Sequence, residues 1–268
     1  MTSPRIPAGG ANEDFWRDYL TRGDSSERRW RGLMRRLPSG PRCKLCAAPF
    51  HGPVGSVMRI VGKFPSAMDP KVCNTCFSFM EKNRGGAEIV CSFVFADIRN
   101  STTIAERLSP RDFRALVDRF YTAASDAIYA NDGGIDKFVG DEIVAYFFPL
   151  MSGPDHARHA VDAALGILRA TGHGTPEGPW VPVGVGVNSG SAWVGAVGDG
   201  AHVELTALGD NVNITARLAS TAQGGEVLVT ADAMRAAGLE MSGLEHRSLE
   251  LKGREQTTDV VSVRVGPA

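Results

Sequence analysis

Hydrophobic and polar positions follow two different periods in the part of the chain that begins near residue 88. The apolar run 89–95 predicts a buried strand. Residues 135–139 and 143–148 predict two further short strands, and the residues between them, 140–142, predict a tight hairpin turn. These segments together predict a β-sheet.

Other segments have the spacing of amphipathic helices. Ser109 and Pro110 predict a helix start. Hydrophobic residues then recur every three or four positions at Phe113, Leu116, Val117, Phe120, Tyr121 and Ala124. A second helix is predicted over residues 155–171, with its inward face at Ala157, Ala160, Val161, Ala164, Leu165 and Leu168. We expect both faces to belong to the core, and His156 and His159 to be solvated. Alternating strands and helices predict an α+β or α/β domain.

Two acidic residues stand where predicted strands end. Asp97 follows the first strand, and Asp141 lies at the tip of the predicted hairpin. Residues 99–103 then open a helix, whose free N–H groups suit phosphate. Either aspartate alone is typical of an ordinary turn. Two hard carboxylates beside a helix N-terminus, however, fit magnesium and a nucleoside triphosphate.

An asparagine and an arginine share one face of another predicted helix, within residues 206–218. Asp210 is expected to cap its N-terminus, and Asn213 and Arg217 lie four residues apart and point in the same direction. A guanidinium beside an amide suits phosphoryl transfer, in which charge on the transferring group must be stabilised. Taken alone, the pair also fits an ordinary surface helix.

Four cysteines precede the predicted sheet in two Cys-x-x-Cys pairs, Cys43 with Cys46 and Cys73 with Cys76. With this spacing two knuckles converge on a tetrahedral metal. We expect structural zinc, with an iron–sulfur cluster and a redox switch as the alternatives. The fifth cysteine, Cys91, lies in the first strand and is expected in the core.

The segments before the first cysteine pair predict amphipathic helices. Apolar residues recur at helical spacing at Phe15, Trp16, Tyr19 and Leu20, and again at Trp30, Leu33, Met34 and Leu37. Residues 28–36 carry five arginines, which raises nucleic-acid binding as a second class of function. The formal net charge of −1 argues against that class. We interpret the region as a regulatory or dimer-setting element, with a helical cap of no regulatory role as the alternative.

Composition is that of a folded protein. The 268 residues, 43% hydrophobic and 22% charged, suffice for one large and one small domain. No apolar run reaches the roughly 18 residues of a membrane span, and the polar residues 1–30 lack the apolar stretch of a signal peptide. We therefore expect a cytoplasmic protein.

Four segments, in order, resemble motifs of the class III nucleotidyl cyclases. Residues 95–102 (FADIRNST) resemble the first metal-binding strand and phosphate loop, and residues 137–141 (KFVGD) resemble the second metal motif. Residues 185–198 resemble the strand, turn and strand that continue the family's sheet, and residues 206–218 (TALGDNVNITARL) resemble the transition-state segment. The resemblance implies an α+β catalytic domain with a ferredoxin-like βαββαβ core and extra strands.

The resemblance begins near residue 88 and sets the expected organisation of the chain. The expected parts are a disordered N-terminus (1–12), an amphipathic helical segment (13–42), a four-cysteine module of the zinc-knuckle type (43–76), a linking element (77–87) and the catalytic domain (88–268).

The resemblance also implies roles for the motif residues. Asp97, Asp141 and the Ile98 carbonyl would hold two Mg²⁺ or Mn²⁺ ions per active site. Asn213 and Arg217 would stabilise the transition state. Lys137 and Thr206 would recognise adenine, because an ammonium can donate to a ring nitrogen and a hydroxyl can accept from an exocyclic amine. Some use of GTP stays open.

Phosphate contacts are expected from Asn100, Ser101 and Thr102 at the start of the first helix. A further cation is expected from the predicted edge hairpin over residues 249–265, and either Lys252 or Arg254 occupies the corresponding place. These basic residues equally suit an edge strand that must not pair with other chains.

The implied activity is adenylyl cyclase, in which the ribose 3′-hydroxyl attacks the α-phosphate of ATP to give 3′,5′-cyclic AMP and pyrophosphate. No general base stands out, and a metal can lower the pKa of the hydroxyl instead. The resemblance implies a head-to-tail homodimer with the metal carboxylates of each site from one chain and the Asn and Arg from the other. The alternatives are a catalytically silent nucleotide-binding sensor of the same fold and a zinc-dependent nucleic-acid-binding regulator.

Overall fold

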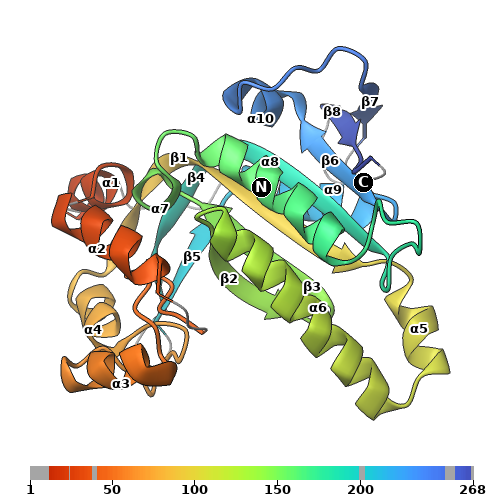
Figure 1. Cartoon of the computed structure of the whole chain (residues 1–268). Coiled ribbons are helices and arrows are strands. Elements are labelled where there is room, and N and C mark those ends of the chain that lie inside the picture. Colours follow the sequence, from red (N-terminus) through yellow and green to blue (C-terminus); the bar gives the residue numbers. More distant parts are fainter. Residues whose placement is uncertain (1–11, 24, 38–40, 199–202, 251–256, 267–268) are drawn as a thin grey trace, which may run out of the picture. The chain divides into compact units, whose positions relative to one another are not determined.

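The computed structural model describes residues 12–23, 25–37, 41–198, 203–250 and 257–266 (Figure 1). The chain divides into two compact units. The first comprises residues 1–89 and 193–208, and the second comprises residues 90–192 and 209–268. Strands β1 (Gly85–Ile98) and β4 (Val183–Val197) each begin in one unit and end in the other.

The second unit is built on a mixed sheet with the strand order β2-β3-β1-β4-β6-β8-β7. Besides β1 and β4, its strands are β2 (Gly134–Val139), β3 (Glu142–Phe147), β6 (Glu226–Thr230), β7 (Glu245–Leu249) and β8 (Thr258–Val263). β4 and β6 are parallel, whereas β1 and β3, β2 and β3, β6 and β8, and β7 and β8 pair antiparallel. Helices and a mixed sheet make this an α+β fold.

Helices cover both faces of this sheet. The helices are α5 (Ser101–Arg107), α6 (Pro110–Ala130), α7 (Pro149–Ser152), α8 (His156–Ala170), α9 (Asp210–Thr221) and α10 (Ala231–Ala236). α6 and α8 lie side by side over one face (Figure 1). Val227 and Val229 of β6 belong to the same hydrophobic core as residues of α6 and α8. Leu228, which lies between these two valines, packs instead with Ile214 and Leu218 of α9. Because alternate strand residues point to opposite faces, α9 covers the other face.

The first unit contains the helices α1 (Glu13–Thr21), α2 (Ser25–Arg35), α3 (Gly52–Ile60) and α4 (Asn74–Lys82). It also contains β5 (Glu204–Leu208), which pairs antiparallel with the end of β4. Trp16 of α1 is fully buried and donates from its indole nitrogen to the Asn83 carbonyl oxygen at 2.8 Å. The rings of Tyr19 and Phe79 pack close by in a tilted arrangement, with centroids 5.0 Å apart. These contacts hold α1 against α4.

Most elements predicted from the hydrophobic pattern are present. Ser109 caps α6 by accepting from the Asp112 amide, and Cys91 is fully buried as expected. β7 and β8 pair at the edge of the sheet, but β7 ends at Leu249, where the predicted hairpin begins, so only β8 lies within the predicted range. The segment 77–87 contains the end of α4 and the first residues of β1.

Three local predictions were wrong. Gly209 rather than Asp210 is the N-cap of α9, so Asp210 lies in the first helical turn. His156 is buried rather than solvated, because its Nδ1 lies 2.8 Å from the buried Ser92 hydroxyl. The predicted strand, turn and strand over residues 185–198 is one strand, β4, because its ladder to β5 continues to Val197.

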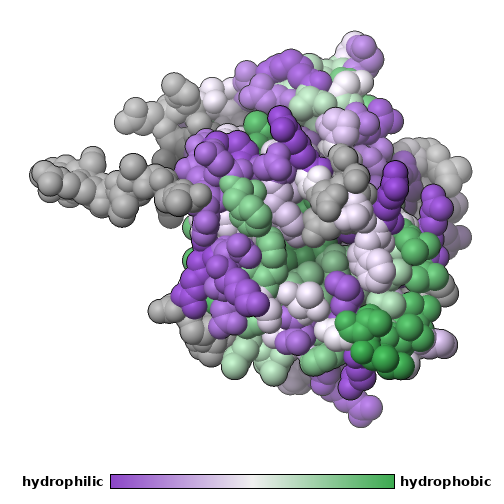
Figure 2. Space-filling view, turned by 90° about the vertical axis from the view of Figure 1, so that its left-hand side faces the viewer, coloured by the Kyte–Doolittle hydropathy of each residue, from purple (hydrophilic) through white to green (hydrophobic). Residues whose placement is uncertain are grey.

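Exposed hydrophobic side chains gather on α3 and the residues after it. Val57, Ile60 and Val61 are more than half exposed. Figure 2, which looks at the left-hand side of Figure 1, shows a cluster of strongly hydrophobic residues at its lower right. No helix in the described part of the chain is long and apolar enough to cross a membrane.

Candidate active site and cysteine cluster

The two predicted metal carboxylates meet where β1 ends. In the antiparallel pair of β1 and β3, Asp97 lies directly opposite Glu142. The Ile98 amide donates to the Asp141 carbonyl oxygen at 3.4 Å, which places the hairpin tip beside the end of β1. Gly140 takes the left-handed backbone conformation that the turn requires, with φ +64. The structure therefore brings Asp97, Ile98 and Asp141 together.

The carboxyl groups at this point share one electrostatic environment. Burial, with a hydrogen bond to Asp141, raises the pKa of Asp97 to about 7 against the opposing charge of Arg99. Burial also raises the pKa of Glu142 to about 7, with the charges of Asp97 and Asp141 adding to the effect. The single positive charge of Arg99 does not neutralise the carboxyl groups of Asp97, Asp141 and Glu142. The donor set thus fits a hard divalent cation, which would supply the missing positive charge.

Two residues of this site had no role in the sequence analysis. Glu142 follows Asp141 directly, and only the strand register shows that it faces Asp97. Arg99 forms an ion pair with the Asp97 carboxylate, with both side chains largely buried. The signal in the sequence was the charge of Arg99 within the first motif and of Glu142 directly after the second, and charge alone does not reveal these contacts.

The predicted phosphate loop follows β1. Asn100 has a left-handed backbone, with φ +58, and is the N-cap residue of α5. Ser101 is half-buried at the first position of the helix, and Asn100 and Thr102 are exposed. Backbone amides at such a helix start are available to an anion. Lys252 and Arg254 lie outside the described residues.

A network of polar side chains fixes the start of α9. The Asn188 amide on β4 donates to the carbonyl oxygen and to Oδ1 of Asn211, at 3.1 and 3.0 Å. Asn211 donates to the Ser191 carbonyl oxygen at 2.7 Å, and the Thr230 hydroxyl donates to Asn188 at 2.8 Å. Gly190 leaves room for this network, because a Cβ there would lie 2.5 Å from the Asn211 amide nitrogen. The sequence did not predict this network of Asn188, Asn211 and Thr230.

The predicted transition-state pair lies on this fixed helix. Asn213 is exposed and Arg217 is half-buried, one helical turn apart on α9. Among the described residues, no hydrogen bond or ion pair joins either side chain to Asp97 or Asp141.

The two predicted adenine contacts lie on different strands. Lys137 is on β2 opposite Val144, with its Nζ 3.4 Å from a carboxylate oxygen of Asp136. Thr206 is buried on β5, opposite Gly195 of β4. The two residues belong to different units.

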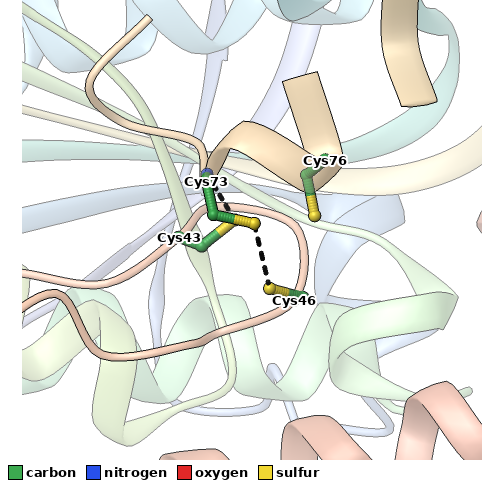
Figure 3. Close-up of side chains that lie close together, drawn as sticks. All are labelled: Cys43, Cys46, Cys73 and Cys76. Atoms are coloured by element: carbon green, nitrogen blue, oxygen red, sulfur yellow. Dashed lines mark hydrogen bonds between the residues drawn. The ribbon is translucent and has the colours of Figure 1, made fainter. Parts of the chain in front are cut away.

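The four cysteines of the first unit converge, as Figure 3 shows. Their sulfur atoms all lie within 4.8 Å of one another, and those of Cys46 and Cys73 are 3.7 Å apart. Tetrahedral zinc with Zn–S bonds of 2.3 Å requires sulfurs about 3.8 Å apart. Cys73 also donates its amide to the Cys43 sulfur at 3.2 Å. The cluster can therefore hold a metal ion.

Electrostatics around the cluster favour thiolates at some positions. Hydrogen bonds from the neighbouring thiols, Cys43 first, hold the pKa of Cys46 below its ordinary value, and the Lys63 charge lowers it further. Lys63 Nζ lies 3.8 Å from the Cys46 sulfur and 5.5 Å from the centre of the Trp30 ring. Thiolates are the ligand form of cysteine, so this environment suits metal binding.

The cysteine knuckle also contacts β5. Lys44, between Cys43 and Cys46, is buried, and its Nζ lies 3.8 Å from a Glu204 carboxylate oxygen. Glu204 stands two positions before Thr206 on that strand. Arg31, one of the arginines in residues 28–36, is also buried, and it donates to the Lys44 carbonyl oxygen at 3.4 Å. At least this arginine packs inside the protein and does not present its charge to a nucleic acid.

Comparison with known families gives one match over most of the chain. The family described as "Adenylate and Guanylate cyclase catalytic domain" matches residues 87–262. The adenylate cyclase, terminal-differentiation specific, of Dictyostelium discoideum is 31% identical over 177 residues, which are 63% of this chain and 8% of that protein. Adenylate cyclase 1 of Rhizobium meliloti is 34% identical over 133 residues, which are 47% of this chain and 20% of that protein. The chain thus matches a small part of these relatives.

Solved structures share the fold of the matched region. The guanylyl cyclase Cya2 superimposes with a TM-score of 0.60 at 25% identity, covering 69% of this chain and 95% of that one. The adenylyl cyclase CyaB from P. aeruginosa superimposes with a TM-score of 0.58 at 23% identity, covering 68% and 96%. Neighbours with both activities therefore share this fold.

Proposed function

The chain belongs to the adenylate and guanylate cyclase catalytic domain family, and on that basis we propose that it is an adenylyl cyclase that converts ATP to 3′,5′-cyclic AMP and pyrophosphate. The observation that carries the proposal is the meeting of Asp97 and Asp141 where β1 ends beside the β2–β3 hairpin. Three crowded acids with a single guanidinium are suited to a divalent cation with a triphosphate.

The metal would be held by Asp97, Asp141 and the Ile98 carbonyl oxygen. A bound Mg²⁺ or Mn²⁺ would supply Lewis-acid chemistry, lowering the pKa of the ribose 3′-hydroxyl and neutralising charge on the phosphates. The chain's own part is to bind and orient the nucleotide. Amides at the start of α5, with Asn100, Ser101 and Thr102, would hold phosphate oxygens.

The transition state would be stabilised by Asn213 and Arg217. The amide would orient the ribose, and the guanidinium fork would neutralise charge that builds up on the phosphate. The hydrogen bonds that Asn211 makes support this role, because they fix the first turn of α9, the helix that carries Asn213 and Arg217. In a head-to-tail homodimer, each pair would serve the metal carboxylates of the partner subunit.

Preference for ATP over GTP rests on Lys137 and Thr206. Lys137 would donate to an adenine ring nitrogen, and the Thr206 hydroxyl would accept from the exocyclic amine. The curated relatives named above as adenylate cyclases support this reading. The solved neighbours include guanylyl cyclases, so the base preference needs its own test.

We propose zinc for the four-cysteine cluster. Four sulfurs within 4.8 Å of one another and no oxygen donor among the cluster residues favour it. The first unit would then be a zinc-stabilised regulatory element, supported by the contact of Lys44 with Glu204 of β5.

Substitution of the metal carboxylates tests the catalytic assignment. Asp97→Ala and Asp141→Ala should each abolish cyclic AMP formation, while circular dichroism and thermal unfolding stay close to wild type. Arg158→Ala, which breaks only an exposed ion pair on α8, is the control. Persisting cyclic AMP formation in both aspartate variants would remove the site assignment.

A further inference from the structure

Arg99 follows the end of β1 and is held in place by its backbone. Its amide donates to the Pro182 carbonyl oxygen at 2.8 Å, at the residue before β4 begins. It lies two positions after Asp97 and directly before the phosphate loop. The start of its side chain is therefore fixed between two strands of the sheet.

The guanidinium joins two elements that carry different parts of the proposed site. Nη2 forms an ion pair with Oδ2 of Asp97, and Nη1 donates to the Ser220 carbonyl oxygen at 2.9 Å. Ser220 lies in the last turn of α9, where free carbonyls carry partial negative charge. The Arg99 side chain is 17% exposed, and its Nε has no hydrogen-bond partner among the described residues. Arg99 therefore connects Asp97 to the helix of Asn213 and Arg217.

The contact with Asp97 conflicts with metal binding. The guanidinium occupies Oδ2 of Asp97, so a cation can use that oxygen only by displacing Arg99, and a second positive charge next to the cation repels it. The contact with Ser220 has no such conflict, because that oxygen belongs to the helix backbone. One side chain thus makes one contact that a metal must displace and one contact that can remain.

We propose that Arg99 is a positioning residue that holds the Asp97 carboxylate in the metal-free protein, yields it to the divalent cation, and anchors the C-terminal end of α9 throughout. The proposal rests on the proposed function, because it takes Asp97 as a metal ligand. It adds a competition at the metal site and a link from that site to the helix of the transition-state pair.

Mn²⁺ binding to the nucleotide-free full chain tests the competition without turnover. Free Mn²⁺ is followed by electron paramagnetic resonance, and its preference for oxygen donors keeps the cysteine cluster out of the measurement. At about pH 8, where proton competition at Asp97 is smallest, Arg99→Gln should bind Mn²⁺ at least about tenfold more tightly, because a charged hydrogen bond to the ligand no longer has to be broken. Arg114→Gln, which removes the same charge from an exposed pair on α6, should bind as wild type.

The two contacts can be separated with a conservative variant. Arg99→Lys keeps a positive charge near Asp97 but lacks the planar fork that reaches both oxygens. Its Mn²⁺ affinity should stay within about threefold of wild type, while kcat at saturating metal falls at least about tenfold, as expected when a positioning contact is lost. If Arg99→Gln does not fold, the measurements on Arg99→Lys test the proposal instead.

The measured affinities and rates can refute the role of Arg99 without refuting the proposed function. Mn²⁺ affinity of Arg99→Gln within about twofold of wild type, or full kcat in Arg99→Lys, would overturn the role of Arg99. Asp97→Asn must lose Mn²⁺ binding if Asp97 is a ligand. Unchanged binding in Asp97→Asn would instead refute the metal site itself.

Discussion

Glu142 lies directly opposite Asp97 across the antiparallel pair of β1 and β3. This register adds a third carboxyl to the two that the motifs identify, at the point where the hairpin tip meets the end of β1. Burial raises the pKa of both residues to about 7. The site is therefore partly protonated near neutral pH until a cation enters it.

Metal affinity should rise with pH. Below about pH 7 the carboxyls of Asp97 and Glu142 carry protons, which a divalent cation must displace. The dissociation constant for Mn²⁺ should fall by up to about tenfold per pH unit for each proton displaced, and level off above about pH 8. Titrations of the nucleotide-free protein at about pH 6, 7 and 8 measure this. Affinity that does not change with pH would contradict the account.

Stability of the metal-free protein should change in the opposite direction. The folded-state pKa values of Asp97 and Glu142 lie above those of exposed carboxyls, so the folded state binds protons more tightly. The contribution of these two carboxyls to stability therefore falls as pH rises from about 4 to 7, and Glu142→Gln should remove the share of Glu142. Urea unfolding at several pH values provides the measurement.

Two inactive variants should restore activity when combined. Asp97→Ala removes the metal site, and Arg217→Ala removes the transition-state guanidinium, so each homodimer should be inactive. A mixed head-to-tail dimer contains one complete site, and random pairing should recover up to about a quarter of wild-type activity. Co-expression with two different tags isolates the mixed dimer. An isolated mixed dimer without activity would contradict the shared-site arrangement.

The cysteine cluster should contain about one zinc ion per chain. Replacing one of four ligands, as in Cys46→Ser or Cys73→Ser, should cause loss of zinc and lower the unfolding temperature, because metal-binding free energy is folding free energy. Cys91→Ser is the matched control for zinc content, since Cys91 is a buried residue of β1 that does not belong to the cluster. Metal analysis and the absorption spectrum decide the identity, and a coloured, iron-containing protein would refute zinc.

Gly190→Ala should disturb the start of α9. The new Cβ would meet the Asn211 amide, which two hydrogen bonds hold in place. We expect a loss of about 1–3 kcal/mol in stability together with a lower kcat. Gly32→Ala in α2, where a Cβ would meet nothing within 4 Å, should be neutral or slightly stabilising. An unperturbed Gly190→Ala enzyme would show that the network does not position the helix.

The sequence predicted the elements that carry the two carboxylates, because these elements depend on local patterns. The strand that carries Asp97, the hairpin at Asp141 and the α6 cap at Ser109 each follow from a few neighbouring residues. The contacts of Arg99 with Ser220 and of Asn188 with Asn211 could not be predicted, because they join residues far apart in the sequence. His156 was misjudged for the same reason, since its partner Ser92 lies on a distant strand.

Product formation by the purified protein tests the central claim most directly. ATP and GTP are supplied in parallel, with Mg²⁺ or Mn²⁺ as the added divalent ion, and cyclic AMP and cyclic GMP are quantified. We predict cyclic AMP from ATP at a kcat/KM at least about tenfold above that for GTP, and a lower ratio in Lys137→Glu. Cyclic GMP as the main product, or no cyclic nucleotide under any combination, would contradict the account.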